Sequence, residues 1–490
     1  MNQFIFSPGA WSIIVLYIFV LLVIGWFGKK ARKKESLKEF YLAGNGFGFI
    51  VLVLTLYATQ YSGNTLLGFT GRAHKVGFSW VMSLHFMTAI VVFYLIFAPK
   101  LYTLSKKYSF ITPTDYLNQR FSNKGINIIA TIIMVLGLIN YLLSQFIAMG
   151  RLVEGLTDID PFKAFVIAVV GLAIVMLIYE SLGGLRAVAW TDVIQGFILF
   201  IGFGVLIALV LNKYGSMGEI TQQIFNNPEI SKKAMPPAPV VIRGWFSYIL
   251  IVGMGAALYP QAIQRIYAAK SAKTLRRSLQ VMAFFPLTTT LIALVVGIFG
   301  IIHFSTLENS DQVLSVMLSD IQNDTTVGYW LVVILFAAVL AAIMSTADSA
   351  LLAISSMLTK DIYSGIINKT ASEETLTKLG KKISIFVVII LIGLAILLRN
   401  EPIVKLLDKK FDMLIQLVPA FFIGIHWKRL RPYPVFFGIL IGLIIAIGLS
   451  LIGHNKPFNI HAGIYGLIVN LFISIGFSLF SKDNEIREIS

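Results

Sequence analysis

The residues with the clearest potential for ion chemistry form the stripe Ala342, Ser345, Thr346 and Ser349. Their spacing of i, i+3, i+4 and i+7 places one backbone carbonyl and three hydroxyls on one face of a helix. Oxygen ligands without a cage of carboxylates suit a monovalent cation better than calcium. A single Ser or Thr in a membrane helix commonly bonds back to the carbonyl four residues earlier. Four oxygen positions on one face instead favour an ion site.

Two acidic residues lie inside apolar segments and can add charge to such a site. An acid in hydrocarbon costs roughly 2.5–3.5 kcal/mol on insertion scales, so each needs a partner or a function. Asp348, one turn from Ser345, is a candidate ligand of a second ion, an acceptor of hydroxyl hydrogen bonds or a partner of Arg265. Asp192 is the other candidate, and its alternative is an interfacial acid paired with Arg186.

Two apolar segments are interrupted by small residues or proline, at 57–63 and at 253–260. In membrane transporters, an unwound stretch near the bilayer midplane supplies carbonyl oxygens to cations. Gly and Pro are also common in membrane helices, where they permit close packing or a kink. Each interruption opens a block of five apolar spans, and this matched position favours a binding site.

The composition predicts that lipid is the solvent for most of the chain. The 490 residues are 57% hydrophobic and 13% charged, with a mean hydropathy of +0.82, which is typical of an integral membrane protein. The chain contains no Cys, so disulfides and thiolate metal sites are excluded. The net charge of +16 is spread over short loops between apolar spans, which indicates membrane topology and no nucleic-acid partner.

Apolar runs long enough to cross the hydrocarbon, about 20 residues each, predict thirteen membrane helices. They lie near 10–28, 46–70, 78–98, 126–149, 162–180, 187–211, 245–265, 280–303, 327–357, 383–398, 403–425, 433–452 and 459–480. Most of the 40 Lys and Arg residues lie in alternate loops on one side, and basic residues in short loops favour the cytoplasm. We therefore expect the N-terminus outside and the C-terminus inside.

The order of the spans predicts an inverted repeat, because two successive blocks with an odd number of helices enter the membrane from opposite sides. The fold class is an all-α polytopic membrane protein, with residues 1–490 as a single transporter domain. Its expected parts are an extra N-terminal helix at 10–28, repeats at 46–211 and 245–425, and two C-terminal helices within 433–480.

Several longer motifs carry a resemblance to a known family, at 39–44, 55–71, 183–195, 259–265 and 341–363. In their order and topology they resemble the sodium:solute symporter family, whose members carry proline, pantothenate, monocarboxylates, choline, sugars and sialic acid. The resemblance covers nearly the whole chain. It implies sodium as the coupling ion and a fold similar to the neurotransmitter:sodium symporters, with one helix before a ten-helix core and two after it.

The resemblance also implies ion sites. The sodium site of the family falls on the carbonyls of Ala58, Tyr61 and Ala342 and the hydroxyls of Ser345 and Thr346. A second sodium site of some members falls on Asp192, Ser345, Thr346, Asp348 and Ser349. Asp348 stands where certain members have serine. An acid there can strengthen the ion site, carry a proton or make a structural hydrogen bond.

The solute pocket implied by the resemblance falls on Gln60, Ser62, Thr65, Trp80, Gln145 and Tyr259, which are neutral polar or aromatic residues. Gln60 stands where proline carriers have an acid, which disfavours proline. An organic anion would need Arg, Lys or a helix N-terminus in the pocket. The charged residues at 408–412 are interpreted as an interfacial cluster or, as the less favoured alternative, as an outer gate. The motif at 259–265 is more similar to monocarboxylate carriers, so a small carboxylate or zwitterion is favoured.

We predict a sodium-coupled secondary active symporter that imports a monocarboxylate, amino acid or pantothenate-like solute by alternating access. We expect it in the bacterial inner membrane, without an obligate protein partner, and with sodium as its only metal and no other cofactor. Alternatives are a proton-coupled symporter using Asp348 or His85 and a membrane sensor that binds solute without moving it. A channel requires rings of repeated residues and an enzyme requires a catalytic constellation. The sequence shows neither pattern.

Overall fold

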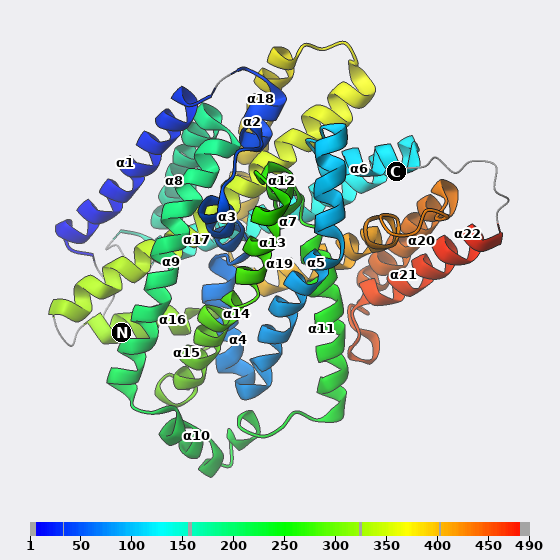
Figure 1. Cartoon of the computed structure of the whole chain (residues 1–490). Helices are drawn as coiled ribbons and strands as arrows, with labels where there is room; N and C mark the ends of the chain where they lie inside the picture. The colour runs from blue at the N-terminus through cyan, green and yellow to red at the C-terminus, as the bar shows by residue number, and fades with distance from the viewer. Residues whose placement is uncertain (1–5, 33, 155–158, 323–325, 401–402, 481–490) are drawn as a thin grey trace.

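The computed structural model describes residues 6–32, 34–154, 159–322, 326–400 and 403–480. Among these residues the regular structure is helical, and strand pairing is confined to a single bridge between Phe47 and Ala269. The all-α prediction is therefore confirmed. Figure 1 shows the helices in one bundle, with α10 (Met217–Asn226) at one end and α2 (Leu37–Leu42) near the other. The orientation of these ends relative to a membrane stays a prediction.

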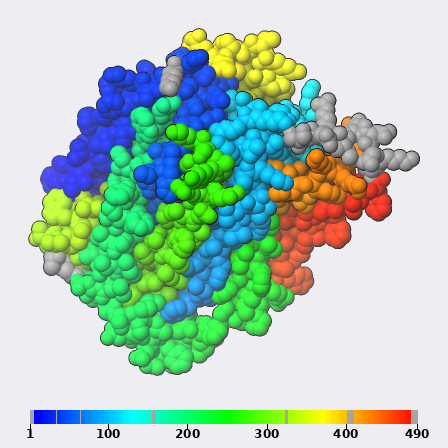
Figure 2. Space-filling view, viewed as in Figure 1, coloured from blue at the N-terminus to red at the C-terminus, as the bar shows by residue number. Residues whose placement is uncertain are grey.

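The first predicted repeat begins with an interrupted span and continues through longer helices. Its helices are α3 (Phe49–Gln60), α4 (Phe69–Val76), α5 (Met82–Tyr108), α6 (Pro113–Phe121), α7 (Lys124–Glu154), α8 (Pro161–Gly183) and α9 (Leu185–Tyr214). Before them stands α1 (Pro8–Lys30), which lies at one flank of the molecule in Figure 2.

The second predicted repeat also begins with an interrupted span. Its helices are α11 (Pro239–Ala257), α12 (Pro260–Ala268), α13 (Ala272–Met282), α14 (Phe285–Thr288), α15 (Thr290–His303), α16 (Val313–Gln322), α17 (Thr326–Met357), α18 (Glu373–Leu397) and α19 (Ile403–Leu414). The chain closes with α20 (Pro432–Leu451), α21 (Ala462–Leu471) and α22 (Phe477–Phe480), at the flank opposite α1 (Figure 2).

In the described part of the chain, eleven helical stretches are long and apolar enough to cross a membrane. Two of the thirteen predicted spans, 46–70 and 403–425, are not separate members of this set. The helices within them, α3 and α19, have 12 residues each, which is short of the roughly 20 that a span needs. The number thirteen therefore stays a prediction.

Both predicted interruptions are present. α3 ends at Gln60, Tyr61 adopts an extended conformation with φ −102° and ψ 97°, and the chain coils again in a π-helical turn at Asn64–Gly68. In the second repeat α11 ends at Ala257 and α12 begins at Pro260. Proline suits a first helical position because its missing amide would have no partner there. A helix end leaves carbonyls without intrahelical partners, so both interruptions present oxygen atoms inside the bundle.

The two interrupted helices are tied together at one end by backbone hydrogen bonds. The Phe47 amide donates to the Ala268 carbonyl at 3.1 Å, and the Lys270 amide donates to the Phe47 carbonyl at 2.9 Å. Phe47 shortly precedes α3, and Ala268 ends α12. These halves of the two spans are therefore joined directly.

Helix α17 is the central element. Its residues are buried without interruption from Leu335 to Met357, and a helix that is apolar on all sides is typical of a buried position. Its few polar side chains must find partners within the protein, because an unpartnered buried polar group is costly. This requirement concentrates the polar groups of the bundle around α17.

We expect Gly63→Ala to destabilise the contact between the first interruption and α17. A Cβ at Gly63 would lie 2.2 Å from Ile343 Cγ1, and overpacking of this kind costs about 1–3 kcal/mol. The melting temperature of the detergent-purified variant should fall. Gly171→Ala in α8 is the control, because its Cβ would meet nothing within 4 Å. A Gly63→Ala protein as stable as the wild type would contradict the close contact.

Candidate functional site

A buried ion pair lies at the centre of the polar network. Arg265 Nη2 on α12 lies 2.8 Å from Asp192 Oδ2 on α9, and both side chains are 0% exposed. Removal of one member of such a pair leaves an uncompensated charge in a medium of low dielectric constant. Each charged group can therefore be buried only because the other one compensates its charge. The predicted alternative partner, Arg186, instead forms an ion pair with Glu39 at 2.7 Å.

The guanidinium of Arg265 also contacts both interrupted helices and α17. Its Nε donates to Thr55 Oγ1 on α3 at 2.7 Å, and its Nη1 donates to the Gln261 carbonyl on α12 at 3.0 Å. Its Nη2 donates to Ser349 Oγ on α17 at 2.5 Å. The planar fork of donors in arginine suits a multiply bonded position of this kind.

Asp192 receives further hydrogen bonds from two hydroxyls. Ser345 Oγ donates to Asp192 Oδ1 at 2.5 Å, and the Thr55 hydroxyl donates to Asp192 Oδ2. Asp192 thereby connects α9 to α3, α12 and α17. Of the second predicted sodium set, Asp192 and Ser345 are thus in direct contact.

Asp348, the other buried acid on the site, receives hydrogen bonds from hydroxyls. The Tyr179 hydroxyl on α8 donates to Asp348 Oδ2 at 2.6 Å, and Ser349 Oγ donates to Asp348 Oδ1 at 3.2 Å. Ser349 in turn lies 3.4 Å from the Thr59 hydroxyl of α3. Of Asp192 and Asp348, it is Asp192 that forms the ion pair with the guanidinium of Arg265. The site therefore combines two carboxylates with one guanidinium.

The residues of the first predicted sodium site are all buried, and one pair of them is in contact between α3 and α17. Thr346 Oγ1 on α17 lies 3.5 Å from the carbonyl oxygen of Ala58. This is long for an O–H···O hydrogen bond. Sodium has nearly the radius of calcium, whose oxygen ligands lie at roughly 2.3–2.6 Å, so two ligands at right angles around it are roughly 3.3–3.7 Å apart. The observed separation fits a shared ion. Tyr61 and Ala342, whose carbonyls complete the predicted set, are 2% and 1% exposed.

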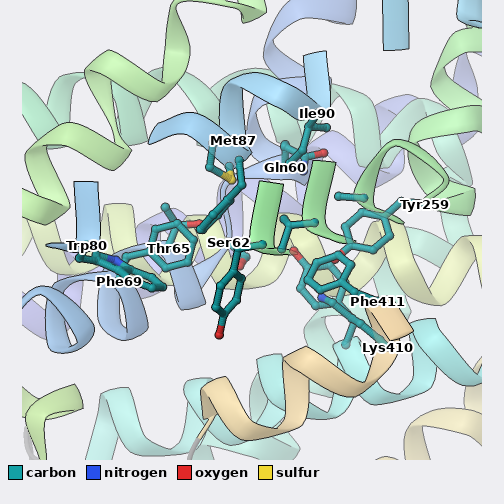
Figure 3. A pocket seen from close by; sticks show the side chains of 15 residues that line it. Gln60, Ser62, Thr65, Phe69, Trp80, Met87, Ile90, Tyr259, Lys410 and Phe411 are labelled. Atoms are coloured by element: carbon teal, nitrogen blue, oxygen red, sulfur yellow. The ribbon is translucent and has the colours of Figure 1, made fainter. Parts of the chain in front are cut away.

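A cavity of about 70 Å³ lies beside the interruption of α3. Figure 3 shows Ser62 and Thr65 near its middle, Trp80 and Phe69 at one end, and Tyr259 with Lys410 at the other. Five of the predicted solute residues line it, namely Gln60, Ser62, Thr65, Trp80 and Tyr259. The sixth, Gln145, is buried elsewhere on α7, where its amide nitrogen donates to Ser144 Oγ at 3.0 Å.

Sequence reasoning missed most of the apolar wall and one charge. The further lining residues are Phe69, Phe86, Met87, Ile90, Tyr141, Tyr248, Val252, Ala256, Lys410 and Phe411. A signal existed for Lys410, because an ionisable residue inside an apolar span indicates function by default. The proposed proton carrier His85 is exposed, and its ring lies 6.1 Å from that of Trp245, outside this lining.

Two interrupted helices beside a buried charge network and a small cavity are the arrangement typical of secondary active transporters. The profile of the sodium:solute symporter family matches residues 40–442, and the chain belongs to this family. It is a sodium-coupled symporter for a small organic solute and an integral, multi-pass protein of the plasma membrane.

The relatives agree with this assignment. The sodium/pantothenate symporter of Haemophilus influenzae is 26% identical over 464 residues, covering 92% of both chains. The sodium/proline symporter of Salmonella typhimurium is 25% identical over 448 residues, covering 88% of this chain and 86% of its own. The family and these relatives are transporters. The outward-open structure of a sodium-coupled sialic acid symporter has a TM-score of 0.82 at 20% identity, covering 99% of this chain and 100% of its own. This likeness shows the inverted-repeat fold.

We expect Arg265→Gln to destabilise the protein by about 3–5 kcal/mol, because it leaves the buried Asp192 charge without its partner. Chemical or thermal unfolding in detergent measures this loss. The double variant Arg265→Gln with Asp192→Asn should recover part of it, since neither charge is then present. Lys378→Gln, which breaks an exposed pair with Glu374, is the control and should leave the melting temperature unchanged. Equal losses in the single and double variants would contradict the coupling.

Proposed function

We propose that one sodium ion binds between the interruption of α3 and helix α17. Its binding couples sodium entry to the import of solute by alternating access. The ligands are the carbonyls of Ala58, Tyr61 and Ala342 and the hydroxyls of Ser345 and Thr346. The observation that carries this proposal is the 3.5 Å separation of Thr346 Oγ1 and the Ala58 carbonyl oxygen in a buried site. It matches two ligands of one ion better than it matches a hydrogen bond.

The chain order explains how the ion and the solute influence each other. Tyr61, a proposed ion ligand, stands between Gln60 and Ser62, which both line the cavity. An ion that orders the Tyr61 carbonyl therefore orders the solute contacts on either side. Sodium that enters from outside also carries a positive charge down the membrane potential, which contributes about 2.3 kcal/mol per charge per 100 mV.

We expect Thr346→Val to abolish the stabilisation that sodium gives over potassium, because the substitution removes one ligand oxygen at nearly constant shape. In the wild type, sodium at a hundredfold excess over its dissociation constant should add about 2.7 kcal/mol to apparent stability. Thermal unfolding in matched sodium and potassium buffers measures both. Thr131→Val is the control, because Thr131 on α7 is equally buried and bonds back to the Asn127 carbonyl at 2.8 Å. An unchanged sodium effect in Thr346→Val would remove this site.

We further propose a second cation beside Asp348, held with Asp192, Ser345, Thr346 and Ser349. Charge balance supports it. Arg265 compensates Asp192 at 2.8 Å, whereas the hydrogen bonds to Asp348 come from the hydroxyls of Tyr179 and Ser349. A buried carboxylate requires a cation or a proton. A proton there is the competing possibility, and it would make the carrier partly proton-coupled.

Asp348→Asn should lower the Hill coefficient for sodium towards one in proteoliposome uptake, because it removes the charge that the second ion compensates. Asp361→Asn is the control, since Asp361 is a buried acid that accepts bonds from Thr112 and Thr114 instead. A Hill coefficient that stays at its wild-type value would exclude a second sodium at Asp348. Wild-type uptake driven by a pH gradient without sodium, and lost in Asp348→Asn, would assign a proton to this acid.

A further inference from the structure

Lys410 gives the solute cavity a positive charge that the sequence analysis did not anticipate. The residue lies on α19 and lines the cavity, and its side chain is 1% exposed. Among the lining residues that the structure describes, it is the only one with a formal charge. The neighbouring Lys409 is exposed. Of these two neighbouring lysines, Lys410 therefore places its charge in the cavity, whereas Lys409 places its charge on the surface of α19.

Three aromatic rings surround the ammonium of Lys410. Its Nζ lies 3.3 Å from the ring centre of Tyr141 and 4.9 Å from those of Tyr259 and Phe411. The rings also stack on one another, with centroids 5.3 Å apart for Tyr141 and Tyr259 and 5.8 Å apart for Tyr259 and Phe411. The negative faces of aromatic rings attract a cation. This stack therefore holds the ammonium at one end of the cavity (Figure 3).

The described residues that line the cavity offer no acid to a solute. Asp412 lies two residues from Lys410 on α19 and is absent from the lining. Asp412 Oδ1 accepts a hydrogen bond from the Gly463 amide at the start of α21, at 2.7 Å. The lining residues include no Asp or Glu within the described chain. A cationic group on the solute would thus meet an ammonium and no carboxylate.

The cavity is small, and most of its wall is apolar. Its volume of about 70 Å³ has room for roughly five water molecules, given about 10–15 Å³ for each. Opposite Lys410 stand Trp80 and Phe69, with the neutral groups of Ser62 and Thr65 between the two ends (Figure 3). This arrangement suits a short molecule with an anionic end and a compact end that is apolar or weakly polar.

We propose that Lys410 binds the carboxylate of the solute and so selects a small organic monocarboxylate without an amino group. The proposal rests on the proposed function, since the cavity is taken as the solute site. An ammonium that lines the cavity suits a carboxylate, whereas multiply charged phosphate groups are usually bound by several donors or by arginine. The apolar end distinguishes an organic acid from an inorganic anion.

The first experiment compares an acid with its neutral isostere on the wild-type protein. Thermal unfolding in sodium buffer is recorded with propionate and with propionamide, and then with pyruvate, pantothenate, proline and choline. We expect propionate or pyruvate to bind at least roughly 30-fold more tightly than propionamide, which corresponds to the loss of a buried charge partner. Proline and choline should bind more weakly than the acids. If no acid binds better than its amide, or proline or choline binds best, the proposal is wrong.

The second experiment tests the residue. Lys410→Gln should lose the preference for propionate over propionamide, and Lys410→Arg should retain part of it. Lys409→Gln, on the exposed neighbour, is the matched control and should behave as the wild type. Stabilisation of Lys410→Gln by sodium serves as the check that the variant is folded. A Lys410→Gln protein that keeps the full acid preference would overturn the assignment.

The two proposals fail in different ways. If sodium and potassium stabilise the wild type equally, but propionate still binds through Lys410, then the sodium site is wrong and the solute assignment stands. If sodium stabilises the protein and drives uptake of a solute that lacks a carboxylate, then the coupling stands and the assignment of Lys410 is wrong.

Discussion

The ion pair of Arg265 and Asp192 is the interaction on which the arrangement of the bundle depends. Neither group is stable alone in a medium of low dielectric constant, so the helices that carry them must meet at a definite place. The guanidinium also bonds Thr55 of α3 and Ser349 of α17. Both interrupted helices and the central helix thus share one charged contact, and their relative positions follow from it.

The same contact prepares the candidate ion ligands. The Ser345 hydroxyl donates a hydrogen bond to Asp192 Oδ1 at 2.5 Å, which leaves the lone pairs of its oxygen directed elsewhere. A hydroxyl polarised in this way is a better ligand for a cation than one that bonds back to its own helix. Asp192 therefore influences the first ion site through Ser345 without lying among its proposed ligands. The charge network and the proposed ion site therefore share Ser345.

Features encoded by local pattern could be predicted from the sequence, whereas contacts between distant helices could not. The stripe on α17 and the two interruptions follow from helical periodicity and from Gly and Pro. Position in the sequence suggests Arg186 as a partner for Asp192 and Arg265 as a partner for Asp348, whereas the packing of the helices pairs Arg265 with Asp192 and Arg186 with Glu39. Lys410 was assigned to an interfacial cluster, because its place in the sequence gives no information on the rings of Tyr141 and Tyr259, which lie beside it only in the folded protein.

The backbone bridge at Phe47 has a mechanical consequence. Because Phe47 is bonded to Ala268 and Lys270, and Thr55 to Arg265, α3 and α12 are held at two levels and form one stiff body. The remaining freedom lies at the interruptions themselves, where no continuous helix resists bending. A rotation of α3 with α12 would therefore change the backbone angles at Tyr61 and Tyr259 together, and it would displace the proposed ion ligand and the lining of the cavity in one movement.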